Sequence, residues 1–150
     1  MGIAKTNKGL CRVYFPEEAP FDKALKRDFP DFLFVKDDTS CTYIKKQIEE
    51  YFSGKRTSFE LELDLQCPPF YKKTLKEVNK IPFGKTVSYK DIAERAGNSK
   101  AVRAAGSANA NNPLPIVIPC HRILNTGGGL GGYGGNLQRK VYLLELEDSL

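Results

Sequence analysis

A cysteine and a histidine stand side by side in the most distinctive segment of this chain. Cys120 is followed by His121, the only histidine in the 150 residues, and then by Arg122. The thiolate is the nucleophilic form of cysteine, and a neighbouring imidazole or guanidinium favours it. Consecutive side chains need not face each other, so His121 could act on the thiol through a water. The sequence therefore predicts a nucleophilic cysteine, with an inert buried thiol as the alternative.

Positioning must contribute more to such a reaction than ionisation of the thiol. A cysteine with a pKa of about 8.5 is roughly 3% thiolate at pH 7, so complete ionisation accelerates attack only about 30-fold. Holding the reacting atoms in line contributes ~7–11 kcal/mol. The segments that position Cys120 therefore matter more than the pKa of its thiol.

Two unusual segments flank the cysteine. Pro113, Pro115 and Pro119 predict a rigid, extended approach to it. After it, residues 127–135 are mostly glycine, which predicts a loop whose backbone approaches a flat ligand; a disordered hairpin tip is the alternative. The same segment contains the G-x-G-x-x-G pattern, but no strand precedes it and an acidic partner would fall past residue 150, so we reject a dinucleotide site.

Two short helices precede this region. Ser88, with Asp91 three residues on, predicts a capped helix closed by Gly97, and Ser99 predicts the cap of the next helix. Two such helices joined by a tight turn are typical of a helix-turn-helix. The second is built from small residues, which offer few hydrogen bonds to base edges but allow close approach to a surface. Arg103 projects from it and suits phosphate contact or the gap left by an extruded base; a tightly packed structural helix is the alternative.

The rest of the chain supplies a small first domain. Alternation of apolar and acidic residues over 59–65 predicts the clearest strand, and residues 10–15 and 32–35 predict two more, the former in a hairpin with the N-terminus. Apolar residues at helical spacing predict a helix that ends before Gly54. Residues 66–69 read as a linker. We therefore expect a small α/β domain over residues 1–67 that carries no chemistry.

The second domain, residues 68–150, is predicted to be mostly helical. It opens with an amphipathic helix over 70–81 that Pro82 ends, and it closes with a helix capped by Asn136. We expect Leu137, Val141 and Leu144 to pack inward from this last helix. The whole chain thus reads as an α/β (α+β) two-domain fold: a small N-terminal sheet with helices, then a helical domain with a helix-turn-helix.

Charge is distributed unevenly between the two halves. Residues 1–67 hold 11 Lys and Arg against 12 Asp and Glu, whereas residues 68–150 hold 12 against 6, a net of +6. A basic half-molecule suits a polyanion such as DNA or RNA. Four scattered cysteines and one histidine argue against a metal site, and we expect no cofactor. With no run of 18 apolar residues and no signal segment, we expect no membrane contact and a cytoplasmic protein.

The motifs together resemble one family. Pro119-Cys120-His121-Arg122, with Asn112-Pro113-Leu114-Pro115 before it and Gly132-Tyr133 after it, is similar to the active-site signature of the O6-alkylguanine-DNA alkyltransferases. The resemblance extends back through 84–89 and 101–106, covering about residues 66–147. It implies single-turnover, irreversible transfer of an alkyl group from O6-alkylguanine in double-stranded DNA to the protein, after the nucleotide is flipped out.

The resemblance also implies roles for individual residues. Cys120 is the expected alkyl acceptor, His121 the base that reaches it through a water, and Glu147 the carboxylate that orients His121. Asn112 resembles the residue that ties the turn before the active-site segment to the helix-turn-helix. Tyr89 resembles the residue that donates to guanine as it leaves and helps to rotate the 3′ phosphate.

The resemblance also divides the remaining residues between a DNA-facing surface and a base pocket. Arg103 is the expected finger that fills the gap left by the flipped nucleotide. The expected DNA contacts are Tyr89, Ser99, Lys100, Arg103 and Arg122. The expected pocket residues are Tyr133, Gly134, Gly135, Val117 and Ile118. We expect a monomer, placed in the nucleus if the source is eukaryotic.

Three other functions remain as alternatives. A lesion-binding protein of the alkyltransferase-like kind would keep the fold without the cysteine, so Cys120 argues against it. A transcriptional regulator would read bases with its second helix, which the small residues there argue against. A cysteine hydrolase would use Cys120, His121 and Glu147 as a triad and would turn over many substrate molecules.

Overall fold

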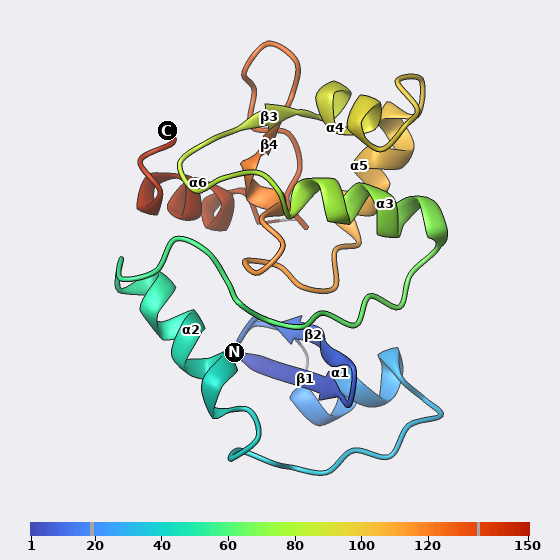
Figure 1. The fold of residues 1–150 in the computed structure, drawn as a ribbon, viewed down its shortest axis with the longest axis vertical. Helices are drawn as coiled ribbons and strands as arrows, with labels where there is room; N and C mark the ends of the chain where they lie inside the picture. The colour runs from blue at the N-terminus through green and yellow to red at the C-terminus, as the bar shows by residue number, and fades with distance from the viewer. Residues whose placement is uncertain (19, 135) are drawn as a thin grey trace.

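The computed structural model describes residues 1–18, 20–134 and 136–150 and has two parts (Figure 1). The N-terminal part contains a two-stranded antiparallel sheet and two helices. The C-terminal part contains four α-helices, one 3-10 helix (η1) and a two-stranded parallel sheet. The bounds in chain order are β1 Gly2–Thr6, β2 Gly9–Tyr14, α1 Phe21–Asp28, α2 Thr42–Phe52, α3 Pro69–Val78, β3 Val87–Ser88, α4 Tyr89–Arg95, α5 Val102–Ala110, η1 Cys120–Arg122, β4 Ile123–Leu124 and α6 Leu137–Leu146. The predicted fold class is confirmed.

The N-terminal hairpin forms as predicted. Strand β1 pairs antiparallel with β2, with Gly2 opposite Tyr14 and Thr6 opposite Gly9. Asn7 and Lys8 make the turn, and Gly9 begins β2. Strand β2 is buried along nearly its whole length, because the second part of the molecule packs against it and the Val13 amide donates to the Pro113 carbonyl at 2.9 Å.

Two other strand predictions are wrong. Residues 59–65 run extended beside β2, but they share only one bridge with it in the described chain, between Leu10 and Leu63, where the Leu10 amide donates to the Glu62 carbonyl. Apolar side chains still alternate inward there, so the period-2 pattern reflects burial without a continuous ladder. Residues 32–35 form no strand in the described structure: Leu33 is fully exposed and Val35 is 86% exposed.

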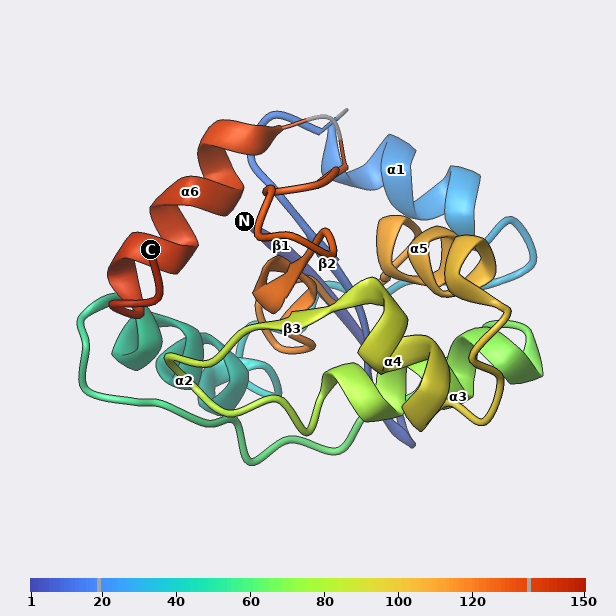
Figure 2. The same cartoon turned by 90° about the horizontal axis from the view of Figure 1, so that it is seen from above.

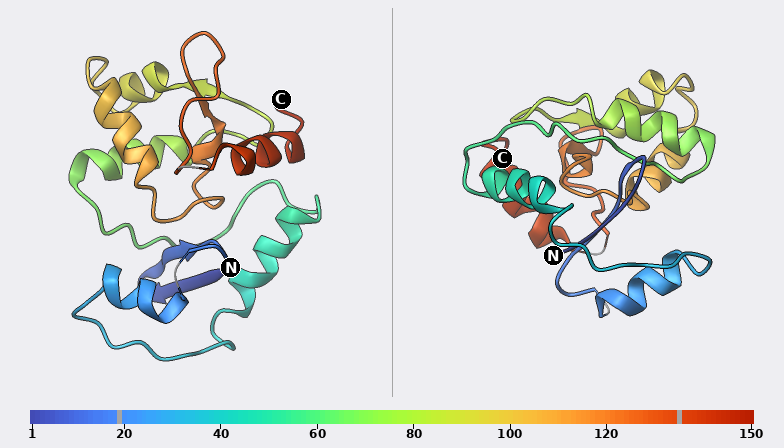
Figure 3. Two further views of the ribbon diagram at one scale, coloured as in Figure 1. Left: turned by 180° about the vertical axis from the view of Figure 1, so that it is seen from behind. Right: turned by 60° about the horizontal axis from the view of Figure 1, so that its bottom comes forward.

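The C-terminal part encloses the region around Cys120. Helices α3, α4 and α5 pack together on one side, and α6 lies on the other, next to α2 (Figures 1 and 2). Strand β3 pairs in parallel with β4, and this pairing brings the start of α4 next to the end of η1. Figure 3 shows from behind that the segment between α5 and η1 loops down toward the N-terminal hairpin.

The helix-turn-helix consists of α4 and α5, which pack against each other. The predicted capping box is confirmed: the Ser88 hydroxyl accepts from the Asp91 amide, and the Asp91 side chain accepts from the Ser88 amide. The predicted Ser99 cap is wrong, because α5 begins two residues later with Ala101 at its N-cap and no side-chain cap. Asn98 instead accepts from the Lys100 amide in the connecting turn.

Both parts share one hydrophobic core. Leu10 and Ile44 from the first part lie in the same buried cluster as Leu75, Ile92 and Ile118 from the second. At the last helix, Asn136 caps the N-terminus and Leu144 is buried, both as predicted. The prediction is wrong for Leu137, which is 48% exposed; Val141 is partly buried, and Leu143 packs inward with Leu144. No helix in the described residues is long and apolar enough to cross a bilayer.

The turn at Gly9 should tolerate no side chain. Its φ of +143° disfavours L-residues, and a Cβ there would lie 2.3 Å from the backbone oxygen of Glu62. Gly9→Ala should lower the free energy of unfolding by about 3 kcal/mol or more. Gly54→Ala is the matched control, since φ is +72° but nothing described lies within 4 Å, and it should cost about 1–2 kcal/mol. Urea unfolding of both variants would measure the difference, and equal losses would contradict this account of the turn.

Candidate active site

Cys120, His121 and Arg122 form the single 3-10 turn η1. Successive side chains in a 3-10 helix point about 120° apart. The cysteine thus faces one direction while the next two residues face others. All three are buried, and Cys120 is 4% exposed.

The approach to the cysteine is a tight turn and not the extended segment that its prolines predict. Pro115 and Ile118 bridge each other, and the Ile118 amide donates to the Leu114 carbonyl at 2.8 Å. Ile116, at the tip, has φ of +76°, a conformation that is costly for a β-branched residue. Its side chain is buried in the same cluster as Cys120, so packing around the site holds the strained turn in place.

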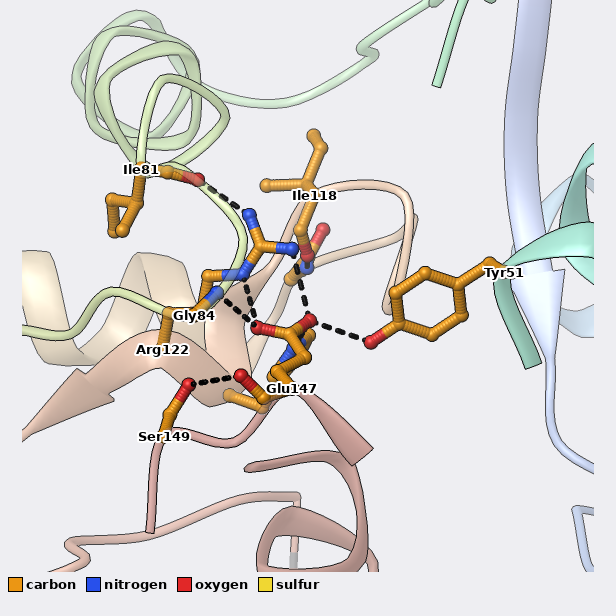
Figure 4. A network of polar contacts seen from close by, with 9 residues as sticks. Tyr51, Ile81, Gly84, Ile118, Arg122, Glu147 and Ser149 are labelled. Carbon is orange, nitrogen blue, oxygen red and sulfur yellow. Dashed lines mark hydrogen bonds and ion pairs between the residues drawn. The ribbon is translucent and has the colours of Figure 1, made fainter. Parts of the chain in front are cut away.

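Glu147 is the centre of a buried polar network (Figure 4). Its Oε1 lies 2.8 Å from His121 Nε2, and the Arg122 guanidinium donates to both carboxylate oxygens at 2.8 and 2.9 Å. Arg122 also donates to the Ile81 carbonyl. These donors hold the pKa of Glu147 at about 2 although burial alone would raise it. The carboxylate is therefore ionised throughout the neutral range.

The network fixes the tautomer of His121. An ionised Glu147 can only accept hydrogen bonds, so His121 Nε2 must carry the proton. Burial lowers the pKa of His121, partly offset by Glu147, so the ring is neutral at pH 7. His121 Nδ1 then presents a lone pair, and among the described residues it has no hydrogen-bond partner. The arrangement leaves a buried base with one free site.

The thiol itself is held in its neutral form. Burial raises the pKa of Cys120, while the polar groups of Asn112 and Tyr133 and the charge of Lys140 act in the opposite direction. The expectation that Arg122 favours the thiolate is wrong, because its guanidinium is neutralised by Glu147. Reactivity at this site therefore needs a base to remove the proton from Cys120.

Cys120 opens onto a pocket of about 560 Å³ at the junction of the two parts. Tyr89, Gly106 and Asn109 from the helix-turn-helix form one wall, and Tyr133 and Gly134 form another. Val117 and Ile118 are buried and are not among the residues that line this pocket, whereas Pro115 is. That the backbone of Val117 and Ile118 flanks the base stays a prediction. Gly135 lies outside the described residues.

A buried lysine holds the glycine-rich loop against this pocket. Lys140 in α6 is fully buried, and its Nζ donates to the carbonyl oxygens of Ile123, Leu130 and Gly132. Burial lowers the pKa of Lys140 to about 8. Sequence reasoning missed it, although a lysine between the apolar residues of the last helix is an available signal.

Lys140→Met should loosen this loop, because three carbonyl groups lose their donor. Amide exchange at Asn125 and Gly128, which are hydrogen-bonded within the loop, should accelerate about tenfold or more. Lys76→Met, at an exposed helical site, is the control and should leave both rates unchanged. Equal exchange in the two variants would mean that the loop holds its own conformation.

Two asparagines connect the helix-turn-helix to the cysteine. Asn112 donates to the Ile118 carbonyl and accepts from the Leu114 amide, so it closes the strained turn. Asn109, which sequence reasoning missed, is buried in α5 and donates to the Cys120 carbonyl at 3.1 Å. Asn109 is thus the direct link between the helix-turn-helix and the cysteine.

The expected DNA contacts divide into exposed and buried groups. Ser99 and Lys100 are exposed in the turn before α5, and Arg103 is exposed in its first turn. Tyr89 is partly buried at the pocket wall, with its hydroxyl 3.4 Å from the Gly132 carbonyl. The expectation that Arg122 contacts DNA is wrong, because it is 6% exposed and paired with Glu147.

The first domain is not inert, contrary to expectation. Arg12, Val13 and Phe15 line the pocket, and the Tyr51 hydroxyl donates to Glu147 Oε1 at 2.6 Å. Helical spacing places Tyr51 in the core, but no sequence signal indicates a partner 96 positions away. The four cysteines are free thiols.

Comparison with known proteins identifies the family. Two family descriptions match: "6-O-methylguanine DNA methyltransferase, ribonuclease-like domain" over residues 1–65, and "6-O-methylguanine DNA methyltransferase, DNA binding domain" over residues 69–149. This chain belongs to the 6-O-methylguanine DNA methyltransferase family.

Individual relatives agree with this assignment. The inducible methylated-DNA–protein-cysteine methyltransferase of Bacillus subtilis is 39% identical over 148 residues, covering 97% of this chain and 82% of the relative. The Mycobacterium tuberculosis methylated-DNA–protein-cysteine methyltransferase is 47% identical over 103 residues, which is 69% of this chain. That match spans 62% of the length of the mycobacterial relative.

Solved structures of this family share the whole fold. The crystal structure of Mycobacterium tuberculosis OGT in complex with DNA superposes with a TM-score of 0.84 at 35% identity, covering 98% of this chain and 85% of that one. The structure of the M. tuberculosis O6-methylguanine methyltransferase gives a TM-score of 0.80 at 36% identity, with coverages of 93% and 81%. Both parts of the present fold are therefore family features.

Proposed function

We propose that this protein repairs alkylated DNA by moving an alkyl group from O6 of guanine onto its own Cys120. The observation that carries the proposal is the position of Cys120 in a pocket, next in sequence to a buried His121–Glu147 pair and walled by the helix-turn-helix. The names of its relatives, and the complex of one of them with DNA, support the same activity.

The proposed steps use side chains of this protein and one water. A water between His121 Nδ1 and the thiol would carry the Cys120 proton to the ring, whose other nitrogen already donates to Glu147. The sulfur then attacks the alkyl carbon, an S–C bond forms and the C–O6 bond breaks, leaving its electron pair on the guanine. Burial raises the pKa of Tyr89, so its hydroxyl stays protonated and can donate to the departing base.

Access to the pocket requires an extrahelical nucleotide. A guanine inside the duplex cannot reach a buried thiol, and flipping costs a few kcal/mol, least where alkylation has already spoiled pairing. We propose that Ser99, Lys100 and Arg103 face the DNA, and that Arg103 fills the gap that the flipped nucleotide leaves in the base stack. Binding to undamaged duplex should then be weak, salt-dependent and indifferent to sequence.

We propose further that residues 1–67 and 68–150 are the two domains of a protein that acts as a monomer. The family matches over 1–65 and 69–149 support the division. A protein whose substrate is DNA works in the compartment that holds it, which is the cytoplasm of a cell without a nucleus.

A stoichiometry titration tests the proposal. Increasing amounts of a duplex with one O6-methylguanine are mixed with a fixed amount of protein, and repaired lesions are counted at completion. The proposal predicts that repair stops at one lesion per protein, because the thioether on Cys120 is not removed. Continued turnover would favour the hydrolase alternative, and tight binding without repair would favour a lesion-binding protein.

A further inference from the structure

Tyr51 connects the N-terminal domain to the polar network behind the cysteine (Figure 4). It lies in α2 and is fully buried, and its hydroxyl donates to Glu147 Oε1 at 2.6 Å. The same oxygen lies 2.8 Å from His121 Nε2 and 2.9 Å from Arg122 Nη2. Three donors therefore share one carboxylate oxygen.

The hydroxyl of Tyr51 is not needed to fill space. The ring packs among Phe52, Phe59 and Phe83, with centroids 5.4, 5.5 and 6.2 Å away. A phenylalanine would satisfy this environment without burying a polar atom. The feature that needs an explanation is thus the placement of a neutral donor on the oxygen that partners the histidine.

We propose that Tyr51 is a positioning residue of alkyl transfer, which sets the basicity of His121 by sharing Glu147 Oε1 with it. A carboxylate oxygen that already accepts from a phenol stabilises an imidazolium less. Tyr51 thereby keeps His121 neutral and able to accept the Cys120 proton. The catalytic use of this effect rests on the proposed function, but the effect on His121 does not.

The groups that act on His121 come from three elements. Glu147, at the end of α6, favours the imidazolium, whereas Lys140 in α6 and Arg122 in η1 oppose it. Tyr51 in α2 acts through Glu147. Removing its hydroxyl leaves the two cations in place and frees one lone pair of Oε1, so the balance moves toward the imidazolium.

The single histidine makes a direct test possible. With ¹⁵N-labelled histidine, the NMR titration of His121 is read without overlap in wild type and in Tyr51→Phe. We expect the His121 pKa to rise by about one unit in Tyr51→Phe, a tenfold change in the ratio of protonated to neutral ring, because a hydrogen bond to a charged group is lost. The acid limb of the pH–rate profile of methyl transfer should move to higher pH by the same amount.

Tyr14→Phe is the matched control. Tyr14 is also a buried tyrosine of the N-terminal domain whose hydroxyl donates to a carboxylate, that of Asp28 at 2.8 Å. The control should leave the His121 titration unchanged. An unchanged His121 pKa in Tyr51→Phe overturns the proposal, whatever the rate does.

A second variant covers the case in which Tyr51→Phe does not fold. Site-specific 3-fluorotyrosine at position 51 keeps the ring and strengthens the donor, so it should lower the His121 pKa; no change or a rise overturns the proposal. The titration also separates two kinds of failure. If wild type transfers no methyl group but the His121 shift is present, the proposed function fails and the coupling stands.

Discussion

Cys120→Ser should lose methyl transfer by on the order of 10⁴-fold or more while keeping its affinity for DNA. A serine hydroxyl fits the same space, but the neutral His121 cannot ionise it appreciably, and an alkoxide is not formed at pH 7. Affinity should persist, because Cys120 is 4% exposed while the residues proposed to face DNA lie at the surface. Loss of the methyl group from a labelled duplex, followed with protein in excess, measures the rate.

Cys41→Ser is the control for this substitution. Cys41 is a partly buried free cysteine at the N-cap of α2 and does not line the active-site pocket. It should react at the wild-type rate. A Cys120→Ser protein that transfers methyl groups within tenfold of wild type would remove Cys120 from the reaction.

Glu147→Gln should lower the free energy of unfolding at pH 7 by about 3–5 kcal/mol. The substitution leaves the buried Arg122 without a counter-charge, and the single amide oxygen of glutamine can replace only one of the two carboxylate oxygens that accept from its guanidinium. Glu145→Gln, two residues earlier in the chain and exposed, is the control and should change the free energy of unfolding by less than about 0.5 kcal/mol. Urea unfolding measures both.

The pH dependence of this difference gives a second check. The folded pKa of Glu147 is about 2, against an ordinary 4.5, so its contribution is complete above pH 4.5 and is lost as pH falls toward 2. The difference in free energy of unfolding between wild type and Glu147→Gln should therefore be about 2 kcal/mol smaller at pH 3 than at pH 7. If the difference in free energy of unfolding were the same at both pH values, the partners of Glu147 would not lower the pKa of its carboxyl group.

The helical domain was largely predictable because its signals are local. The Ser88–Asp91 capping box and the hydrogen bond from the Arg139 amide to the Asn136 side chain each join residues three positions apart, and both form as predicted. Ser99 shows the limit of such signals: it has the right residue type, but the chain needs two more residues of turn before α5 can begin.

Two strands predicted in the N-terminal part are not formed, because apolar residues there do not pair through a ladder of backbone hydrogen bonds. Residues 59–65 keep the alternation of a strand since they cover the core beside β2, although one bridge is all that pairs them in the described chain. Residues 32–35 have the composition of a strand but are largely exposed. A short apolar run does not by itself specify a strand, because its conformation and burial depend on the tertiary structure around it.

The reactive residues of the candidate site could be predicted from the sequence, but the residues that hold them in position could not. Cys120 and His121 are adjacent in sequence, and His121 and Glu147 lie within hydrogen-bond distance in the structure. Tyr51 and Asn109 were not predictable, because their roles depend on long-range or through-backbone contacts that no spacing rule encodes. The assumption that Arg122 faces DNA failed for the same reason, since its partner is 25 positions away.

The central claim is that Cys120 is the acceptor of the alkyl group. Its most direct test is the peptide mass spectrum of the protein after reaction with an equimolar duplex that carries one O6-methylguanine. We predict the mass gain of one methyl group, confined to the peptide that contains Cys120 and absent from Cys120→Ala. An unmodified Cys120 peptide after the lesion has been repaired, or a methyl group on any other residue, would contradict the account.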